Sequence, residues 1–230
     1  FLEQGAYAYM MSLLKENGAD IVRCAFQNRF RTRTEQWLAD ESRCVMEGKA
    51  FLVRFTTDWT CGLLWNKLYK RALFDGIFFE EGHKIDDEYF TYQGVMNAAK
   101  VVCDPRVVYN YRQRASSVMQ SPAAKAQIAV DRIDFMAKRR EKVLERFPEL
   151  RREFDISFVD ALSYLADYPD NTEESIRLLK YYARRYFLQR GNTFPPRYLL
   201  KAVFLMYVTS TEKLLKRPQA KKPSPEDYYA

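Results

Sequence analysis

Histidine is the scarcest residue of this sequence, and cysteine, glycine and proline are also few. One histidine among 230 residues excludes a zinc site built on two imidazoles. The cysteines form no CxxC pair, so in a chain of this length we expect buried, reduced thiols rather than a disulfide framework. They are Cys24, Cys44, Cys61 and Cys103.

Long apolar runs are missing as well. The nearest approach covers residues 198–208 and is interrupted by Lys201, whereas a membrane-spanning helix needs roughly 18 apolar residues. This stretch is therefore predicted to be a core-facing or interface helix. With only 8 Gly and 9 Pro beside 47% hydrophobic residues, the chain is neither disordered nor collagen-like.

Aromatic residues and positive charge are abundant instead. The chain holds 16 Tyr, 16 Phe and 3 Trp, and its formal net charge is +7. The charge is uneven, because residues 115–230 hold 21 Lys+Arg against 15 Asp+Glu, and residues 1–114 hold 16 against 15. The length suits one large domain or two small ones.

The first half of the sequence alternates helical and strand patterns, which predicts an α/β fold. Apolar residues at helical spacing are followed by short apolar runs, and Asn17-Gly18 is a helix stop signal. The predicted helices are 5–17, 47–56 and 86–100; the predicted strands are 19–26, 101–103 and 107–112; a loop or edge hairpin is predicted over 27–43.

The second half reads as helices punctuated by proline. They are predicted over 121–147, 150–167, 172–190 and 195–217. We therefore divide the chain into an α/β part at 1–119, a helical domain at 120–217 and a flexible basic, Pro-rich tail at 218–230.

The basic surface of the helical half has three interpretations. It is a membrane-docking surface, a partner or dimer surface, or a solvated face without a ligand. The best candidate patch is made of Arg184 and Arg185 with Tyr181, Tyr182, Tyr186 and Phe187.

Four blocks in the first half carry a family resemblance. They are LWNKLYKR at 64–71, FEEG at 79–82 with DDEYFTY at 86–92, AKVV at 99–102, and YNYRQR at 109–114 with SVM at 117–119. In this order and spacing they resemble bacterial family 2 glycosyltransferases, the GT-A-fold enzymes of capsule, exopolysaccharide and cell-wall glycan synthesis. The resemblance covers roughly residues 1–120.

The resemblance implies the acceptor-side half of a GT-A (Rossmann-like) fold, followed by an α-helical C-terminal region. It implies an inverting transfer from a nucleotide-diphosphate sugar to a glycan or lipid-linked acceptor. The family's nucleotide-binding strand and DxD motif are not in the sequence, so Mg²⁺ or Mn²⁺ is expected to be held mainly by a missing N-terminal half. This chain alone is therefore predicted to be inactive. The expected location is cytoplasmic, with possible peripheral contact on the inner face of the plasma membrane.

The resemblance makes Asp87 the candidate base that takes the proton of the acceptor hydroxyl. Asp86 is the supporting acid beside it. Like charge and burial raise a carboxyl pKa and a helix N-terminus lowers it, so the net direction stays open. The alternative is that both are ordinary acids at the start of a helix.

Trp65, Asn66 and Lys67 are candidate acceptor-binding residues. An aromatic face stacks on the apolar face of a sugar ring, which suits Trp65. The alternatives are a core tryptophan and a solvated strand end.

Arg112, Arg114 and Ser117 are candidate ligands of the donor diphosphate. Two guanidinium groups that alternate on a strand point the same way and suit bidentate phosphate contact. The alternative is a basic surface strand. Related enzymes often carry a metal-binding histidine where Arg114 stands, so no metal ligand is assigned in this chain. His83, the single imidazole, is a candidate site residue or a surface loop residue.

A second class of function competes with the enzyme. A basic, aromatic chain also suits a non-catalytic module that binds nucleic acid or an anionic surface. The family resemblance argues against nucleic acid as a partner.

Overall fold

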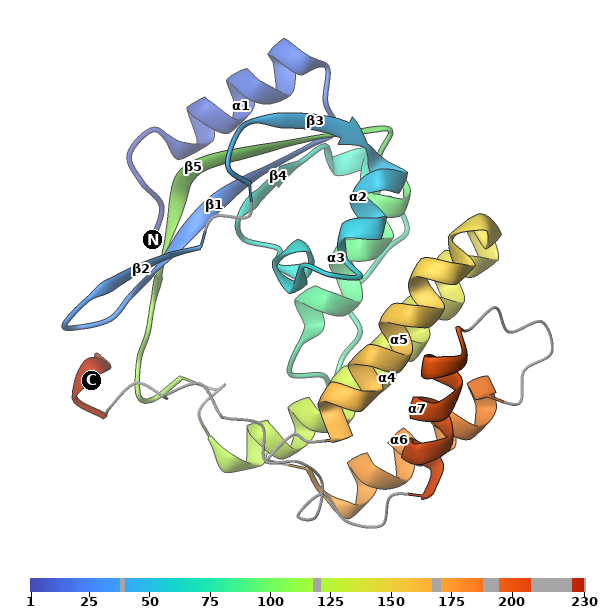
Figure 1. The fold of residues 1–230 in the computed structure, drawn as a ribbon. Coiled ribbons are helices and arrows are strands. Elements are labelled where there is room, and N and C mark those ends of the chain that lie inside the picture. The colour runs from blue at the N-terminus through green and yellow to red at the C-terminus, as the bar shows by residue number, and fades with distance from the viewer. Residues whose placement is uncertain (38–39, 118–120, 167–170, 188–194, 208–224, 230) are drawn as a thin grey trace. The chain divides into compact units, whose positions relative to one another are not determined.

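The computed structural model describes residues 1–37, 40–117, 121–166, 171–187, 195–207 and 225–229 (Figure 1). The chain forms two compact units. Unit 1 comprises residues 1–80, 86–118 and 221–230, and unit 2 comprises 81–85 and 119–220.

A mixed sheet is the centre of unit 1. Its strand order is β2-β1-β5-β3, and β4 also pairs with β1. The two central strands, β1 and β5, are parallel, whereas the other pairs are antiparallel. The strands are β1 (Ile21–Arg29), β2 (Thr34–Trp37), β3 (Cys44–Glu47), β4 (Lys67–Tyr69) and β5 (Lys100–Arg112).

Helices cover both faces of this sheet, which explains why the first six residues of β1 are all buried (Figure 1). On one face α1 (Ala6–Asn17) packs Met10 and Leu13 against Val22. Gly18, at φ 57°, ends α1 with its N–H on the last carbonyls of the helix. The other face carries α2 (Gly48–Arg54) and α3 (Asp86–Met96).

The α3 helix depends on a glycine for its packing. A Cβ on Gly94 would lie 2.3 Å from the ring of Phe74, so only glycine leaves room for this ring. Phe74 in turn stacks on Phe90 with ring centroids 4.4 Å apart. The described residues of unit 1 also include short 3₁₀ turns at Trp59–Gly62 (η1), Arg71–Phe74 (η2) and Pro225–Asp227 (η6).

The α/β fold class predicted from the sequence is confirmed, with differences in detail. The predicted strands at 101–103 and 107–112 are one strand, β5, whose pairing with β1 is irregular between Cys24 and Phe26. The edge hairpin predicted over 27–43 is present in part. Strand β1 continues to Arg29, and the chain then turns into β2, which pairs with it. Strands β3 and β4 were not predicted.

Unit 2 is helical, as predicted for the second half. Its core joins Ile133, Phe158, Leu162, Leu179 and Leu205 from different helices. The helices are α4 (Pro122–Arg146), α5 (Arg151–Ala166), α6 (Glu173–Phe187) and α7 (Pro196–Tyr207), with a short 3₁₀ turn η4 (Pro148–Leu150) before α5. In the described parts of the chain, no helix is both long and apolar enough to span a bilayer.

Residues 225–229, which composition assigns to a flexible tail, are ordered against unit 1. The Tyr229 N–H donates to the Gln113 carbonyl (3.0 Å) and the Asp227 carboxylate pairs with Arg33 (2.9 Å). The rest of that predicted segment, up to residue 224, lies outside the described residues.

Candidate active site

Four side chains from four strands of unit 1 form one row across the sheet. Cys44 on β3 lies opposite Cys103 on β5, Cys103 opposite Arg23 on β1, and Arg23 opposite Lys67 on β4. Paired residues of neighbouring strands point to the same face, so all four lie on the face that carries α2. The Arg54 guanidinium of α2, with Nη1 3.6 Å from Cys103 Sγ, closes over this row.

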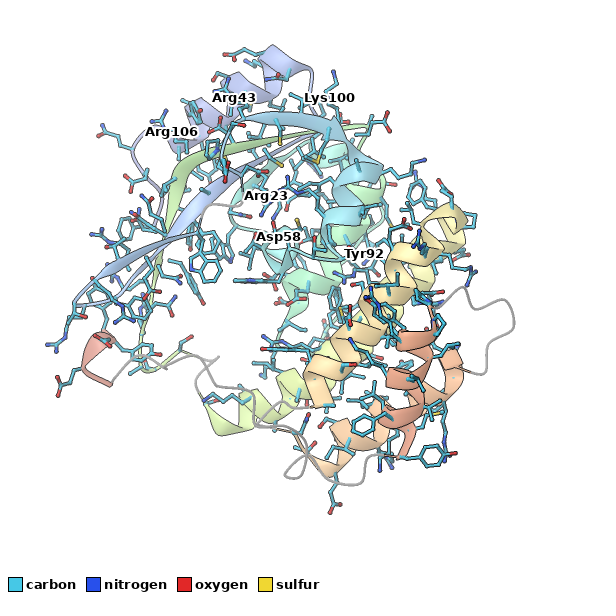
Figure 2. The ribbon with its side chains drawn as sticks, viewed as in Figure 1. Arg23, Arg43, Asp58, Tyr92, Lys100 and Arg106 are labelled. Atoms are coloured by element: carbon cyan, nitrogen blue, oxygen red, sulfur yellow. The ribbon has the colours of Figure 1, made fainter. Side chains whose placement is uncertain are left out.

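Arg23 is the most deeply buried charged side chain of the row. Its side chain is 1% exposed and donates to the Asp58 carboxylate (2.6 Å) and to the Thr60 hydroxyl. Figure 2 shows Arg23 and Asp58 together on the α2–α3 side of the sheet. Burial alone would raise the pKa of Asp58, but Arg23 and Thr60 outweigh it and hold the pKa below its usual value.

Lys67 is enclosed by oxygen atoms. Its Nζ donates to the carbonyls of Thr60 (3.2 Å) and Leu63 and to Asn66 Oδ1 (2.8 Å). Burial lowers its pKa to about 7. The Asn66 Nδ2 donates in turn to the Cys24 carbonyl (3.1 Å). Asn66 and Lys67 thus hold the loop before β4 in place, and acceptor binding by them stays a prediction.

Trp65 lies in a half-buried aromatic box. Its ring stacks on Tyr111 (centroids 5.2 Å apart, 17° between planes), lies against Tyr109 (4.5 Å) and meets Phe26 edge-on (4.8 Å). The half-buried ring therefore takes part in the packing of these aromatic residues, and acceptor binding by Trp65 stays a prediction.

Two tryptophans that sequence reasoning missed extend this aromatic surface. Trp37 stacks on Phe26 at 6.3 Å, and Trp59 meets Trp37 edge-on at 5.6 Å. Trp37 and Trp59 are 42% and 57% exposed. The only signal in the sequence was the high aromatic content, because the contacts join β1, β2 and η1.

Asp87 stands half-buried in the first turn of α3, with Asp86 exposed beside it. Its Oδ1 accepts the Glu88 N–H at 3.0 Å. Burial, followed by the charge of Asp86, raises its pKa, and backbone N–H groups and the Lys67 charge only partly oppose this. The net shift of the Asp87 pKa, whose direction the sequence left open, is therefore upward.

Asp87, the aromatic box and the Lys67 loop are close together. Burial raises the pKa of Tyr111, and the charges of Tyr109 and Asp87 add to this. The pKa of Asp87 in turn responds to Lys67 and to the Leu64 backbone. The structure thus brings the predicted residues 65–67, 86 and 87 into one site.

Arg112 does not join this site. It follows Tyr111 on β5, so its side chain points to the opposite face, where its guanidinium lies over the rings of Phe1 (5.9 Å) and Tyr229 (5.4 Å). Arg114 lies beyond the end of β5, and its backbone forms an isolated parallel β-bridge with Tyr229. Ser117 donates its N–H to the Arg114 carbonyl (3.2 Å). Diphosphate binding by Arg112, Arg114 and Ser117 stays a prediction.

The remaining candidates belong to unit 2. His83 Nδ1 lies 3.1 Å from the buried Asp131 carboxylate, which also accepts from Gln127 (2.8 Å). In the proposed basic patch, Tyr186 is buried and Tyr182 half-buried in the helical core, whereas Tyr181, Arg184 and Arg185 are exposed. The side chain of Phe187 lies outside the described residues. Tyr181, Arg184 and Arg185 line a cavity of about 780 Å³, together with Glu173, Ile176, Arg177, Lys180 and Met206.

Among the described residues, the carboxylates at the site form no group of three possible metal ligands within 4.8 Å of one another. Asp87 has Asp86 as an acidic neighbour and Lys67 as a basic one. Elsewhere among the described residues, Asp40, Cys44 and Cys103 bring ligand atoms within 4.8 Å of one another. Two of those three offer sulfur, which these hard cations do not prefer.

Comparisons with known proteins agree with the fold. No family model matches the sequence, and no curated protein matches it either. Among solved structures, the chain is similar to S. aureus TarS 1–349 in complex with UDP-GlcNAc, with a TM-score of 0.52 at 14% identity. The match covers 90% of this chain and 62% of that one.

Two further TarS crystal structures match with a TM-score of 0.40 and 14% identity. They are S. aureus TarS 1–349 and S. aureus TarS, and the matches cover 61% and 37% of their lengths and 90% of this chain. This chain thus spans less than two thirds of the structures it resembles. The similarity at a TM-score of 0.52 concerns the fold of part of TarS 1–349.

Proposed function

We propose that this chain is part of an inverting glycosyltransferase, and that Asp87 is its general base. The observation that carries the proposal is the setting of Asp87. It is a half-buried carboxylate of raised pKa beside an open aromatic surface. The similarity to TarS bound to UDP-GlcNAc supports a nucleotide-diphosphate sugar as the donor, as an argument from fold analogy.

The chemistry assigned to Asp87 is one proton transfer. The acceptor hydroxyl oxygen attacks the anomeric carbon from the face opposite the leaving group, and Asp87 takes the hydroxyl proton. The bond from the anomeric carbon to the nucleotide diphosphate breaks, and the diphosphate leaves with the electron pair. A raised pKa makes Asp87 a stronger base.

The aromatic surface is proposed to hold the acceptor, a glycan or a lipid-linked sugar. Trp65 lies in the box next to Asp87, and the exposed rings of Trp37 and Trp59 continue the surface. Aromatic rings pack against the C–H faces of sugar rings while the hydroxyl groups stay free for hydrogen bonds.

The leaving diphosphate needs positive charge. Arg114 and Ser117 keep this proposed role, since both follow β5 beyond Tyr111. Arg114 is exposed and Ser117 is half-buried. No step of the proposal involves a metal ion.

The test uses the full-length gene product that contains this sequence. We expect release of nucleoside diphosphate from UDP-GlcNAc in the presence of a glycan acceptor, and loss of that release in Asp87→Asn. The matched control is Asp75→Asn, which changes an exposed acid in the turn after η2 and should leave activity unchanged. Tryptophan fluorescence checks that both variants are folded.

Two results would contradict the proposal separately. Full activity of Asp87→Asn overturns the assignment of the base but not the transferase. No diphosphate release by the wild-type protein with any nucleotide sugar, together with salt-sensitive binding of an oligonucleotide, favours the interaction module instead.

A further inference from the structure

Cys44 and Cys103 stand directly opposite each other in the antiparallel β3–β5 pair. Directly opposed residues have Cα atoms about 4.5 or 5.5 Å apart, depending on their hydrogen bonding. Both values lie inside the range of disulfide-bonded cysteines. Their sulfur atoms already lie within 4.8 Å of each other, and both are free thiols.

The two thiols differ in exposure. Cys103 is fully buried, whereas Cys44, at the start of the edge strand β3, is half-buried. A reagent from solution therefore reaches Cys44 first, and Cys44, directly opposite Cys103, can pass the reaction on to it.

Burial, followed by the Asp40 charge, raises the pKa of Cys103 to about 12, and two guanidinium groups beside the thiol partly oppose this. The Arg54 guanidinium lies 3.6 Å from Cys103 Sγ and is held there by Asp40, with Nη2 and Oδ1 2.7 Å apart. Arg23, opposite Cys103 on β1, adds a second positive charge on the same face. A guanidinium beside a thiol stabilises the thiolate, which is the attacking form.

We propose that Cys44 and Cys103 are a redox modification site, in which a small-molecule disulfide of the glutathione type closes a bond between β3 and β5. The Cys44 thiolate attacks the glutathione disulfide, forms a mixed disulfide and releases one glutathione. The Cys103 thiolate then attacks the Cys44 sulfur and releases the second. The two protein thiols lose two electrons and two protons, and one glutathione disulfide becomes two glutathione molecules.

The other two cysteines are not partners in this reaction. Cys24 follows Arg23 on β1, so its side chain points to the opposite face, where it packs under α1. Cys61 lies in η1 and is not part of the β3–β5 pair. Cys24→Ser is therefore a matched control.

The experiment treats the reduced protein with oxidised glutathione, blocks free thiols with an alkylating reagent, and identifies the products by mass spectrometry of the intact chain and its peptides. We expect a Cys44–Cys103 cross-linked peptide in the wild type and in Cys24→Ser, reversed by a dithiol reductant. Cys103→Ser should stop at the mixed disulfide on Cys44. Cys44→Ser should stay unmodified, because Cys103 is buried.

The role of Arg54 has its own measurement. Arg54→Gln should slow both the reaction at Cys44 and the closure of the mixed disulfide, because the Arg54 charge lowers the pKa of both thiols. The cross-link should also raise the urea midpoint of unit 1, because it ties an edge strand to the central strand. Bonding to another cysteine, a stable mixed disulfide in the wild type, or equal reactivity of Cys44→Ser and Cys103→Ser overturns the proposal.

Discussion

Replacing Arg23 by methionine tests whether the buried row organises unit 1. Methionine fills a similar volume but leaves the Asp58 carboxylate without its partner at 2.6 Å. Breaking a buried ion pair from one side costs about 3–5 kcal/mol. Because the Asp58 side chain is 24% exposed and water reaches it, we expect the lower end, about 3 kcal/mol.

The assay follows tryptophan fluorescence in urea. All three tryptophans lie in unit 1, so the signal reports this unit even if unit 2 unfolds separately. With a urea dependence of about 1–3 kcal/mol per molar, the midpoint should fall by about 1–3 M. The control Arg29→Met makes the same change in the same strand at a half-buried side chain that bonds only Thr34, and should stay within about 0.5 kcal/mol.

The pH dependence gives an independent check. The folded-state pKa of Asp58 is lowered, so the pair stabilises the fold above the unfolded-state pKa and loses this effect as pH falls through the folded-state value. The gap in stability between wild type and Arg23→Met should therefore narrow in acid. If Arg23→Met lowers the free energy of unfolding by less than about 1 kcal/mol at neutral pH, the buried ion pair does not organise unit 1.

Three further changes have defined outcomes. Gly94→Ala places a Cβ 2.3 Å from the Phe74 ring and should destabilise unit 1 by about 1–3 kcal/mol, read from the urea midpoint. Gly62→Ala meets only the flexible Glu88 side chain at 3.2 Å and should cost less; an equal loss would contradict the packing argument. Asp86→Asn removes a charge that raises the pKa of Asp87, so the acid limb of the pH–activity profile should move to lower pH; an unchanged limb would contradict Asp87 as the base.

Much of the fold follows from sequence pattern. The helices of unit 2 were predicted within a few residues because proline and apolar periodicity mark them, except near the ends of α6 and α7, where the predictions run beyond the described residues. Strands β3 and β4, of 4 and 3 residues, are too short to show a period. They form because β5 and β1 offer hydrogen-bonding edges, which is tertiary information.

The roles of the candidate site residues stay predictions. The resemblance led to Asp87 and Trp65, and the structure places both near Tyr111. It did not predict that Lys67 would be enclosed, because the Thr60 and Leu63 carbonyls that hold it become neighbours only after the loop folds. The burial of Arg23 was equally hidden, since its partner Asp58 lies 35 residues away.

The ordered C-terminal residues bear on the order in which the protein is built. Arg31 and Thr32, in the turn between β1 and β2, bond to Glu226 and Asp227, which are synthesised 195 residues later. All of the described helices of unit 2 leave the ribosome in between. Contacts between such distant residues form late, because a long loop must close first. The contacts of residues 226–229 with the β1–β2 turn and with residues 113–115 are therefore expected to be among the last of unit 1 to form.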